Sequence, residues 1–81
     1  MEASGVTSST SAFAITPNDD ADLTYPTRAL YVGTGGDINL LLWDDETTVI
    51  LKNVLGGSCL PLNVRRIYAT DTGASDLVGL R

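Results

Sequence analysis

The sequence predicts an all-β fold, a small antiparallel sandwich or barrel of about six short strands with a flexible N-terminal arm. Short apolar runs recur about every ten residues, clusters of Gly, Asn and Asp separate them, and no segment has a helical period. The densest part of this pattern is residues 27–51, TRALYVGTGGDINLLLWDDETTVIL, where three apolar runs follow one another across two tight polar breaks. Such a pattern is typical of consecutive antiparallel strands in a β-meander.

The length of the chain, 81 residues, suffices for one domain. A chain of this size buries only about 60% of the surface that its unfolded form exposes, so its core barely offsets the conformational entropy lost on folding. Its single cysteine, Cys59, excludes an intrachain disulfide, and there is no histidine or second thiol to complete a zinc site. Oligomerisation is therefore the expected source of additional stability.

The charge of the chain argues against a nucleic-acid partner. The formal net charge is −5 and the isoelectric point is near 4.2, whereas nucleic-acid binders normally have a basic face. No apolar run approaches the roughly 18 residues of a membrane span, and the amino terminus lacks the basic and apolar regions of a leader. We therefore expect a soluble protein that is made in the cytoplasm, with no membrane partner.

Two segments precede the meander. Residues 1–11 are rich in Ser and Thr without apolar periodicity, which predicts a flexible arm before a single β domain at residues 12–81. The arm could instead become ordered against a partner. The run Phe13–Ile15 is stopped by Pro17, and because proline cannot donate to a ladder, an edge strand is expected there.

Three polar clusters in the sequence partly resemble functional motifs but match none of them. Asp19, Asp20 and Asp22 lack the order of a calcium loop and its distal glutamate, so turn and capping roles are expected. A strand pattern follows Gly33–Gly36, so these residues predict a flexible hairpin loop and no phosphate cradle. The acids at 44–46 are expected in a solvated turn, without the desolvation that acid–base catalysis needs.

The middle run of the meander, Ile38–Trp43, has two apolar faces. From Leu40 onward its neighbours Leu41 and Trp43 make the opposite face apolar as well, whereas a strand with one solvated face would alternate cleanly. Either this strand is sandwiched within the monomer, or its second face meets another subunit. The small size of the chain favours a subunit contact with Trp43 as its anchor. The third run, Thr47–Lys52, completes the meander.

The carboxyl-terminal part predicts two more strands. Apolar residues alternate from Cys59 to Val64, and this parity slips at Arg65 and Arg66. The slip indicates either a β-bulge or a bend where the strand passes from one sheet to another. The two arginines could pair with acids of a partner or be solvated surface cations. A closing strand is expected at Leu77–Arg81.

No residue pattern points to catalysis or to a cofactor. Without histidine, the Ser, Thr and Cys side chains lack the usual base that activates a nucleophile. Cys59 opens an apolar strand and is expected to be a buried, inert thiol. Lys52 is the only lysine, and nothing near it indicates a desolvated amine. We therefore expect a protein that is not an enzyme and that binds neither metal nor cofactor.

Several blocks of the chain carry a family resemblance: Ala12–Leu23, Thr27–Asp37, Val54–Ile67, Ala69–Ala74 and Leu77–Leu80. Together they resemble the head-spike base proteins of gene transfer agents and related tailed phages. The most specific block is TRALYVG at 27–33, and the similarity covers about residues 12–81. The chain differs from that family in its acidic turn at 44–46 and in its short, Ser/Thr-rich terminus.

The resemblance implies a virion structural protein. Members of that family are small β proteins that assemble as a ring on the capsid, at its fivefold vertices, and hold a spike or fibre. We therefore expect a homo-oligomeric ring, with a pentamer as the candidate, on the capsid exterior, in contact with the major capsid protein and a spike or fibre protein. The candidate contact residues are Phe13, Tyr31, Leu41, Trp43, Arg65 and Arg66.

A carbohydrate-binding or adhesin-like β module is the alternative function. It would need aromatic rings that a sugar can reach. The candidates are Tyr25, Tyr31, Trp43 and Tyr68.

Overall fold

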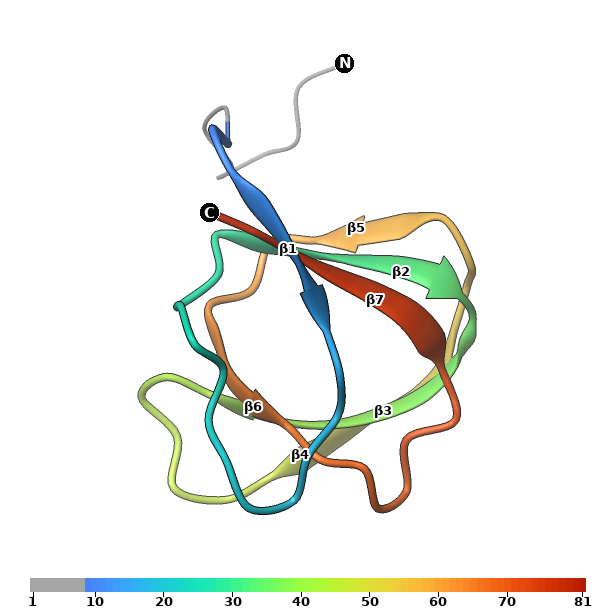
Figure 1. Cartoon of the computed structure of the whole chain (residues 1–81). Coiled ribbons are helices and arrows are strands. Elements are labelled where there is room, and N and C mark those ends of the chain that lie inside the picture. Colours follow the sequence, from blue (N-terminus) through green and yellow to red (C-terminus); the bar gives the residue numbers. More distant parts are fainter. Residues whose placement is uncertain (1–8) are drawn as a thin grey trace.

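Two antiparallel β-sheets form the part of the chain that the structure, a computed structural model, describes, namely residues 9–81 (Figure 1). The strands are β1 (Ala12–Ile15), β2 (Ala29–Thr34), β3 (Gly36–Leu42), β4 (Val49–Val54), β5 (Ser58–Leu60), β6 (Val64–Ile67) and β7 (Ser75–Leu80). One sheet has the order β1-β7-β2-β5 and the other the order β4-β3-β6. This confirms the predicted all-β sandwich. Among residues 9–81 there is no helix long and apolar enough to cross a membrane.

The hydrophobic core lies between the two sheets, because each strand turns alternate side chains inward. On β2, Leu30 and Val32 are fully buried, whereas Tyr31 between them is 41% exposed. The same two-residue period buries Ile38 and Leu40 on β3. The buried core cluster consists of Ile15, Leu30, Val32, Ile38, Leu40, Val64, Ile67, Ala74 and Leu77.

The prediction of a β-meander is wrong at its first turn. β2 and β3 lie in different sheets, so the break at Gly33–Gly36 is a crossing between layers and no hairpin loop. A side chain at Gly35 would collide with the carbonyl oxygen of Val54, so the crossing requires glycine there. A glycine-rich break marks such a close backbone approach as readily as a turn. β3 and β4 do pair as antiparallel neighbours, as expected.

The predicted strand from Cys59 to Val64 is divided between the sheets. β5 pairs with β2, β6 pairs with β3, and Pro61–Asn63 form the link. A proline cannot continue the ladder, which explains why the strand ends before Pro61. This division raises the number of strands from about six to seven.

The parity slip near Arg65 is a β-bulge. Leu41 of β3 lies opposite Arg66, but the next residue, Leu42, lies opposite Val64. Arg65 is therefore the extra residue in β6. The bulge therefore explains the slip at the two arginines, whereas the chain changes sheet earlier, at Pro61–Asn63.

Both ends of the described chain lie in the four-stranded sheet. β1 is at its edge, as predicted, and β7 lies between β1 and β2. The backbone N–H groups of Thr10 and Ser11 donate to the carbonyl oxygen of Arg81 at 3.0 and 3.2 Å, and the Arg81 N–H donates to the Ser11 carbonyl at 2.9 Å. Part of the predicted arm is therefore held against the sheet, while residues 1–8 lie outside the described residues.

Candidate interaction surfaces

The end of β3 forms a shallow hollow of about 280 Å³, here called the tryptophan hollow. The backbone N–H of Trp43 donates to the backbone carbonyl of Asn63 at 3.0 Å, which fixes the end of β3 to the link between β5 and β6. The Trp43 side chain is nonetheless 47% exposed. The hollow is lined by Leu42, Trp43, Asp44, Asp45, Pro61, Leu62 and Asn63.

The second apolar face of β3 is partly covered by the chain itself. Leu41 is only 7% exposed, and Arg66 lies opposite it on β6. Asn39 on the same face is covered by the loop after β6, where its backbone N–H donates to the Thr72 Oγ1 at 3.0 Å. Cover within the monomer therefore accounts for Leu41, whereas Trp43 remains open to a partner.

The two adjacent arginines pair within their own chain. Arg66 Nη2 lies 2.8 Å from Asp22 Oδ1, and Arg65 Nε lies 3.5 Å from Asp22 Oδ2. Arg66 also donates to the backbone carbonyl of Asp19 at 3.1 Å and lies over the Tyr68 ring at 5.5 Å. Surface pairs of this kind add little stability, but they fix the 18–22 loop against β6. Their predicted contact with a partner remains a prediction.

The aspartates of the 18–22 loop have the expected turn and capping roles. The Asp20 N–H donates to the Asn18 Oδ1 at 2.8 Å, which closes a local turn. Asp19 accepts from the Thr70 backbone N–H at 3.0 Å and from the Thr70 hydroxyl at 2.7 Å. These hydrogen bonds, the backbone one first, lower the pKa of Asp19. Within residues 9–81, no three potential ligands gather around a metal position.

Cys59 corrects one prediction. It is exposed on β5, whereas a buried thiol was expected. Cys59 lies directly opposite Tyr31 of β2, and opposite residues of an antiparallel pair point to the same face. Because Tyr31 is on the outer face of the sheet, Cys59 is too.

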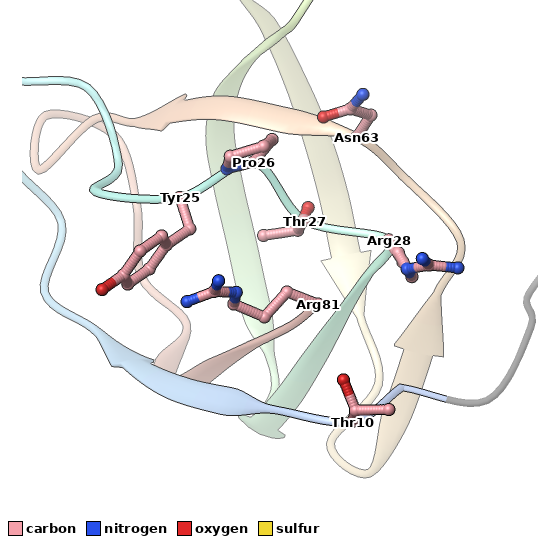
Figure 2. A pocket seen from close by; sticks show the side chains of 7 residues that line it. All are labelled: Thr10, Tyr25, Pro26, Thr27, Arg28, Asn63 and Arg81. Atoms are coloured by element: carbon pink, nitrogen blue, oxygen red, sulfur yellow. The ribbon is translucent and has the colours of Figure 1, made fainter.

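A second hollow, of about 430 Å³, lies at the start of β2 and is here called the arginine hollow (Figure 2). The Arg81 guanidinium lies over the Tyr25 ring, 3.7 Å from its centroid. The Phe13 and Tyr25 rings make a T-shaped contact with their centroids 5.5 Å apart. Sequence reasoning did not find this site, since only the fold brings Tyr25 and Arg81 together. The lining residues are Thr10, Tyr25, Pro26, Thr27, Arg28, Asn63 and Arg81.

Thr27 anchors the floor of the arginine hollow. Its side chain is buried, with 3% of the residue exposed. The hydroxyl donates to the Leu62 carbonyl at 2.7 Å and accepts from the Val64 N–H at 3.0 Å. This one side chain therefore ties the start of β2 to the segment that carries the chain into the other sheet.

Comparison with known proteins identifies the family. No family model matches the chain, and neither does any curated protein. A solved structure, described as the capsid of a native gene transfer agent particle computed with C5 symmetry, contains a similar chain. The two chains are 36% identical over 93% of this chain and 86% of the other, with a TM-score of 0.83. This chain belongs to the family of that gene transfer agent capsid component.

Large apolar side chains remain exposed on this member of the capsid family. They lie at several places in the fold, and two of them, Val49 and Ile50, are neighbours on β4, whose outer edge is unpaired in the described sheet. Exposed apolar groups that are close together mark contact surfaces. The residues are Tyr25, Tyr31, Trp43, Val49, Ile50 and Leu55, exposed by 37–72%.

Proposed function

We propose that this chain is a non-enzymatic virion structural protein, an oligomeric base that attaches to the capsid exterior and holds a head spike or fibre. The observation that carries the proposal is its 36% identity, over 93% of its length, to a component of a gene transfer agent capsid. In this proposal the chain is made in the host cytoplasm. It then assembles as a ring, a pentamer being the candidate, that contacts the major capsid protein and the spike or fibre protein.

The exposed surface supports a role in assembly. A base needs separate faces for its neighbouring copies, for the capsid and for the spike. Trp43 lies at the end of β3, Tyr31 lies on the outer face of the four-stranded sheet, and Ile50 lies on the edge strand β4. Burying these side chains against other proteins would add the hydrophobic stabilisation that a core of this size lacks.

Sedimentation of particles tests the proposal. An epitope-tagged chain is produced in cells that make the particles, and the lysate is separated on a density gradient. The expected result is that the tagged chain sediments with the particles and stays with them after washing. A chain that remains at the top of the gradient, and that light scattering shows to be a monomer at every concentration, would contradict the proposal.

The geometry gives less support to the carbohydrate-binding alternative. A sugar needs an open aromatic face, but Arg81 lies over the Tyr25 ring and Arg66 lies over the Tyr68 ring. Trp43 remains as the best candidate for that function. If its fluorescence is blue-shifted and unquenched by acrylamide in the assembled state, the ring is covered by protein and no sugar reaches it.

A further inference from the structure

The arginine hollow is a positively charged site on an acidic chain. The chain has ten acidic and five basic residues. Two of the basic residues, Arg28 and Arg81, line the arginine hollow, and none of its seven lining residues has an acidic side chain.

The Arg81 side chain is restricted by its stacking on Tyr25. Tyr25 lies against the face of the guanidinium, and Phe13 supports the Tyr25 ring from the side. A guanidinium that stacks through its face keeps its in-plane N–H groups free to donate to an anion. Because the stacking already restricts the side chain, less conformational entropy is lost when a ligand binds.

The wall of the hollow also has an apolar part. Tyr25 lies beside Arg81, Pro26 follows Tyr25 in the chain, and Thr10 and Asn63 add polar groups (Figure 2). A ligand that combines carboxylates with an aromatic or aliphatic group would match both parts of the wall. An inorganic anion would use only the arginines.

The chain itself carries a segment with this chemistry. Asp44, Asp45 and Glu46, here called the acidic turn, follow directly on Trp43 between β3 and β4. Trp43, Asp44 and Glu46 are exposed. The ion pairs among residues 9–81 involve Asp22 and Asp37 and none of the three acids of this turn.

We propose that Trp43 and the acidic turn of one copy dock into the arginine hollow of a second copy. In this contact the carboxylates receive hydrogen bonds from Arg81, and the Trp43 ring lies against Tyr25 and Pro26. The proposal rests on the proposed function, because it identifies a contact between copies of the oligomer. A charged pair that is desolvated in such a contact gives it both specificity and register.

The positions of the two surfaces bear on the shape of the assembly. Asn63 lines both the arginine hollow and the tryptophan hollow, so the two surfaces lie on adjoining sides of the sandwich. Contacts between two different surfaces generate rings or open filaments.

Charge-neutral variants test the contact in the full chain. Arg81→Gln and the double variant Asp44→Asn/Asp45→Asn should each raise the dissociation constant between copies by about tenfold or more, as measured by light scattering on dilution. Trp43 is the only tryptophan, so its fluorescence reports burial of the turn. Arg81→Gln should abolish the blue shift that association causes, although Arg81 and Trp43 lie in different hollows.

Matched controls change the same charges elsewhere. Lys52→Gln removes one cation from a side chain that is 73% exposed, and Asp20→Asn/Asp71→Asn removes two exposed acids. Both should leave the dissociation constant within about twofold of wild type, since exposed charges outside a contact contribute little. Circular dichroism and urea unfolding verify that every variant is folded.

Charge-reversal variants are the decisive test of the contact. Arg81→Glu in one chain and Asp44→Arg/Asp45→Arg in another should each fail to self-associate, and their mixture should associate again. Self-association that is unaffected by these changes, or a wild-type chain that is monomeric throughout, would overturn the proposal. If the charge-reversed chains still join particles, the proposed function holds but this contact is not needed for it. If the mixture of charge-reversed chains associates but the chain is absent from particles, the contact exists and the proposed function is wrong.

Discussion

Thr27 is, with Asn39, one of two buried polar residues in the described part of the chain, and its hydroxyl makes hydrogen bonds to two backbone groups at once. In Thr27→Val the side chain keeps its shape, but the Leu62 carbonyl and the Val64 N–H lose their partner. The free energy of unfolding should fall by about 1–3 kcal/mol, measured by urea titration. Thr24→Val, at an exposed position, should change it by about 0.5 kcal/mol or less. Equal effects in both variants would show that the Thr27 hydrogen bonds contribute nothing.

Two aspartates should make the fold sensitive to acid. Asp19 accepts from the Thr70 N–H and Asp37 from the Asn53 N–H, and these backbone hydrogen bonds lower both pKa values. Because the pKa is lower in the folded state, the unfolded chain binds more protons in acid. The stabilisation is therefore present above the ordinary carboxyl pKa of about 3.9 and is lost as the pH falls through the folded-state values.

Urea unfolding at pH 7 and pH 3 measures this loss. The wild-type protein should lose more stability between these two pH values than Asp19→Asn or Asp37→Asn does. Asp20→Asn is the control, since only the backbone N–H of Asp20 takes part in a hydrogen bond among the described residues. If all four proteins lose the same amount, the two carboxylates are not responsible.

Individual residues differed in how far the sequence could predict them. Alternation places Leu30 with Val32, and Ile38 with Leu40, on a shared face of each strand, because a period of two depends only on local geometry, and the structure shows that these faces are buried. The exposure of Cys59 depends on which residue of β2 lies opposite it, and the stacking of Arg81 on Tyr25 depends on the return of β7 beside β1. Both features depend on contacts between segments that are far apart in the sequence, so no local pattern revealed the exposure of Cys59 or the stacking of Arg81.

At the scale of elements, Gly79 fixes how the edge strand β1 lies against β7. Phe13 is directly opposite Gly79, and a Cβ on Gly79 would be 2.6 Å from the Phe13 ring. Gly79→Ala should therefore displace the ring and destabilise the fold by about 1–3 kcal/mol. Amide hydrogen exchange in β1 should become faster than in β3.

Two further variants check that prediction. Gly73→Ala is the control, because the nearest atom to its added Cβ is 3.9 Å away. Adding Phe13→Leu to Gly79→Ala should recover part of the lost stability, since the smaller side chain leaves room. A Gly79→Ala variant as stable as Gly73→Ala, with unchanged exchange in β1, would contradict the packing described here.

Strand positions were predicted more reliably than strand partners. Every apolar run became a strand, but β2 and β3 separate into different sheets at Gly35, and β5 and β6 separate at Pro61–Asn63. Both changes of sheet occur at Gly or Pro. These residues also form ordinary turns, so composition alone cannot distinguish a hairpin from a crossing.

At the scale of the whole molecule, a variant at Trp43 distinguishes the stability of the assembly from the stability of the single copy. Trp43→Ala should weaken association by about 2 kcal/mol per contact, the cost of removing an interface anchor. The unfolding free energy of the single copy should fall by less than the roughly 3–5 kcal/mol of a core tryptophan, because the residue is 47% exposed. Sedimentation and urea unfolding measure the two effects. Unchanged association would remove Trp43 from the interface.

The functional prediction depended on the whole chain and not on any cluster of reactive groups. Composition and spacing indicated an oligomeric β module, and the resemblance of blocks such as TRALYVG at 27–33 indicated the gene transfer agent family. The 36% identity to a gene transfer agent capsid component agrees with that family. Leu41, one of the candidate contact residues, is buried in the single copy, and no local signal in the sequence marks the arginine hollow. The contacts themselves stay predictions.

An electron cryomicroscopy map of particles from producing cells tests the central claim most directly, with particles from cells that lack this gene as the comparison. The account predicts density on the outer surface of the capsid into which the two-sheet sandwich fits, present in the first map and absent from the second. Identical maps, with the chain found only in the soluble fraction of the cells, would contradict it.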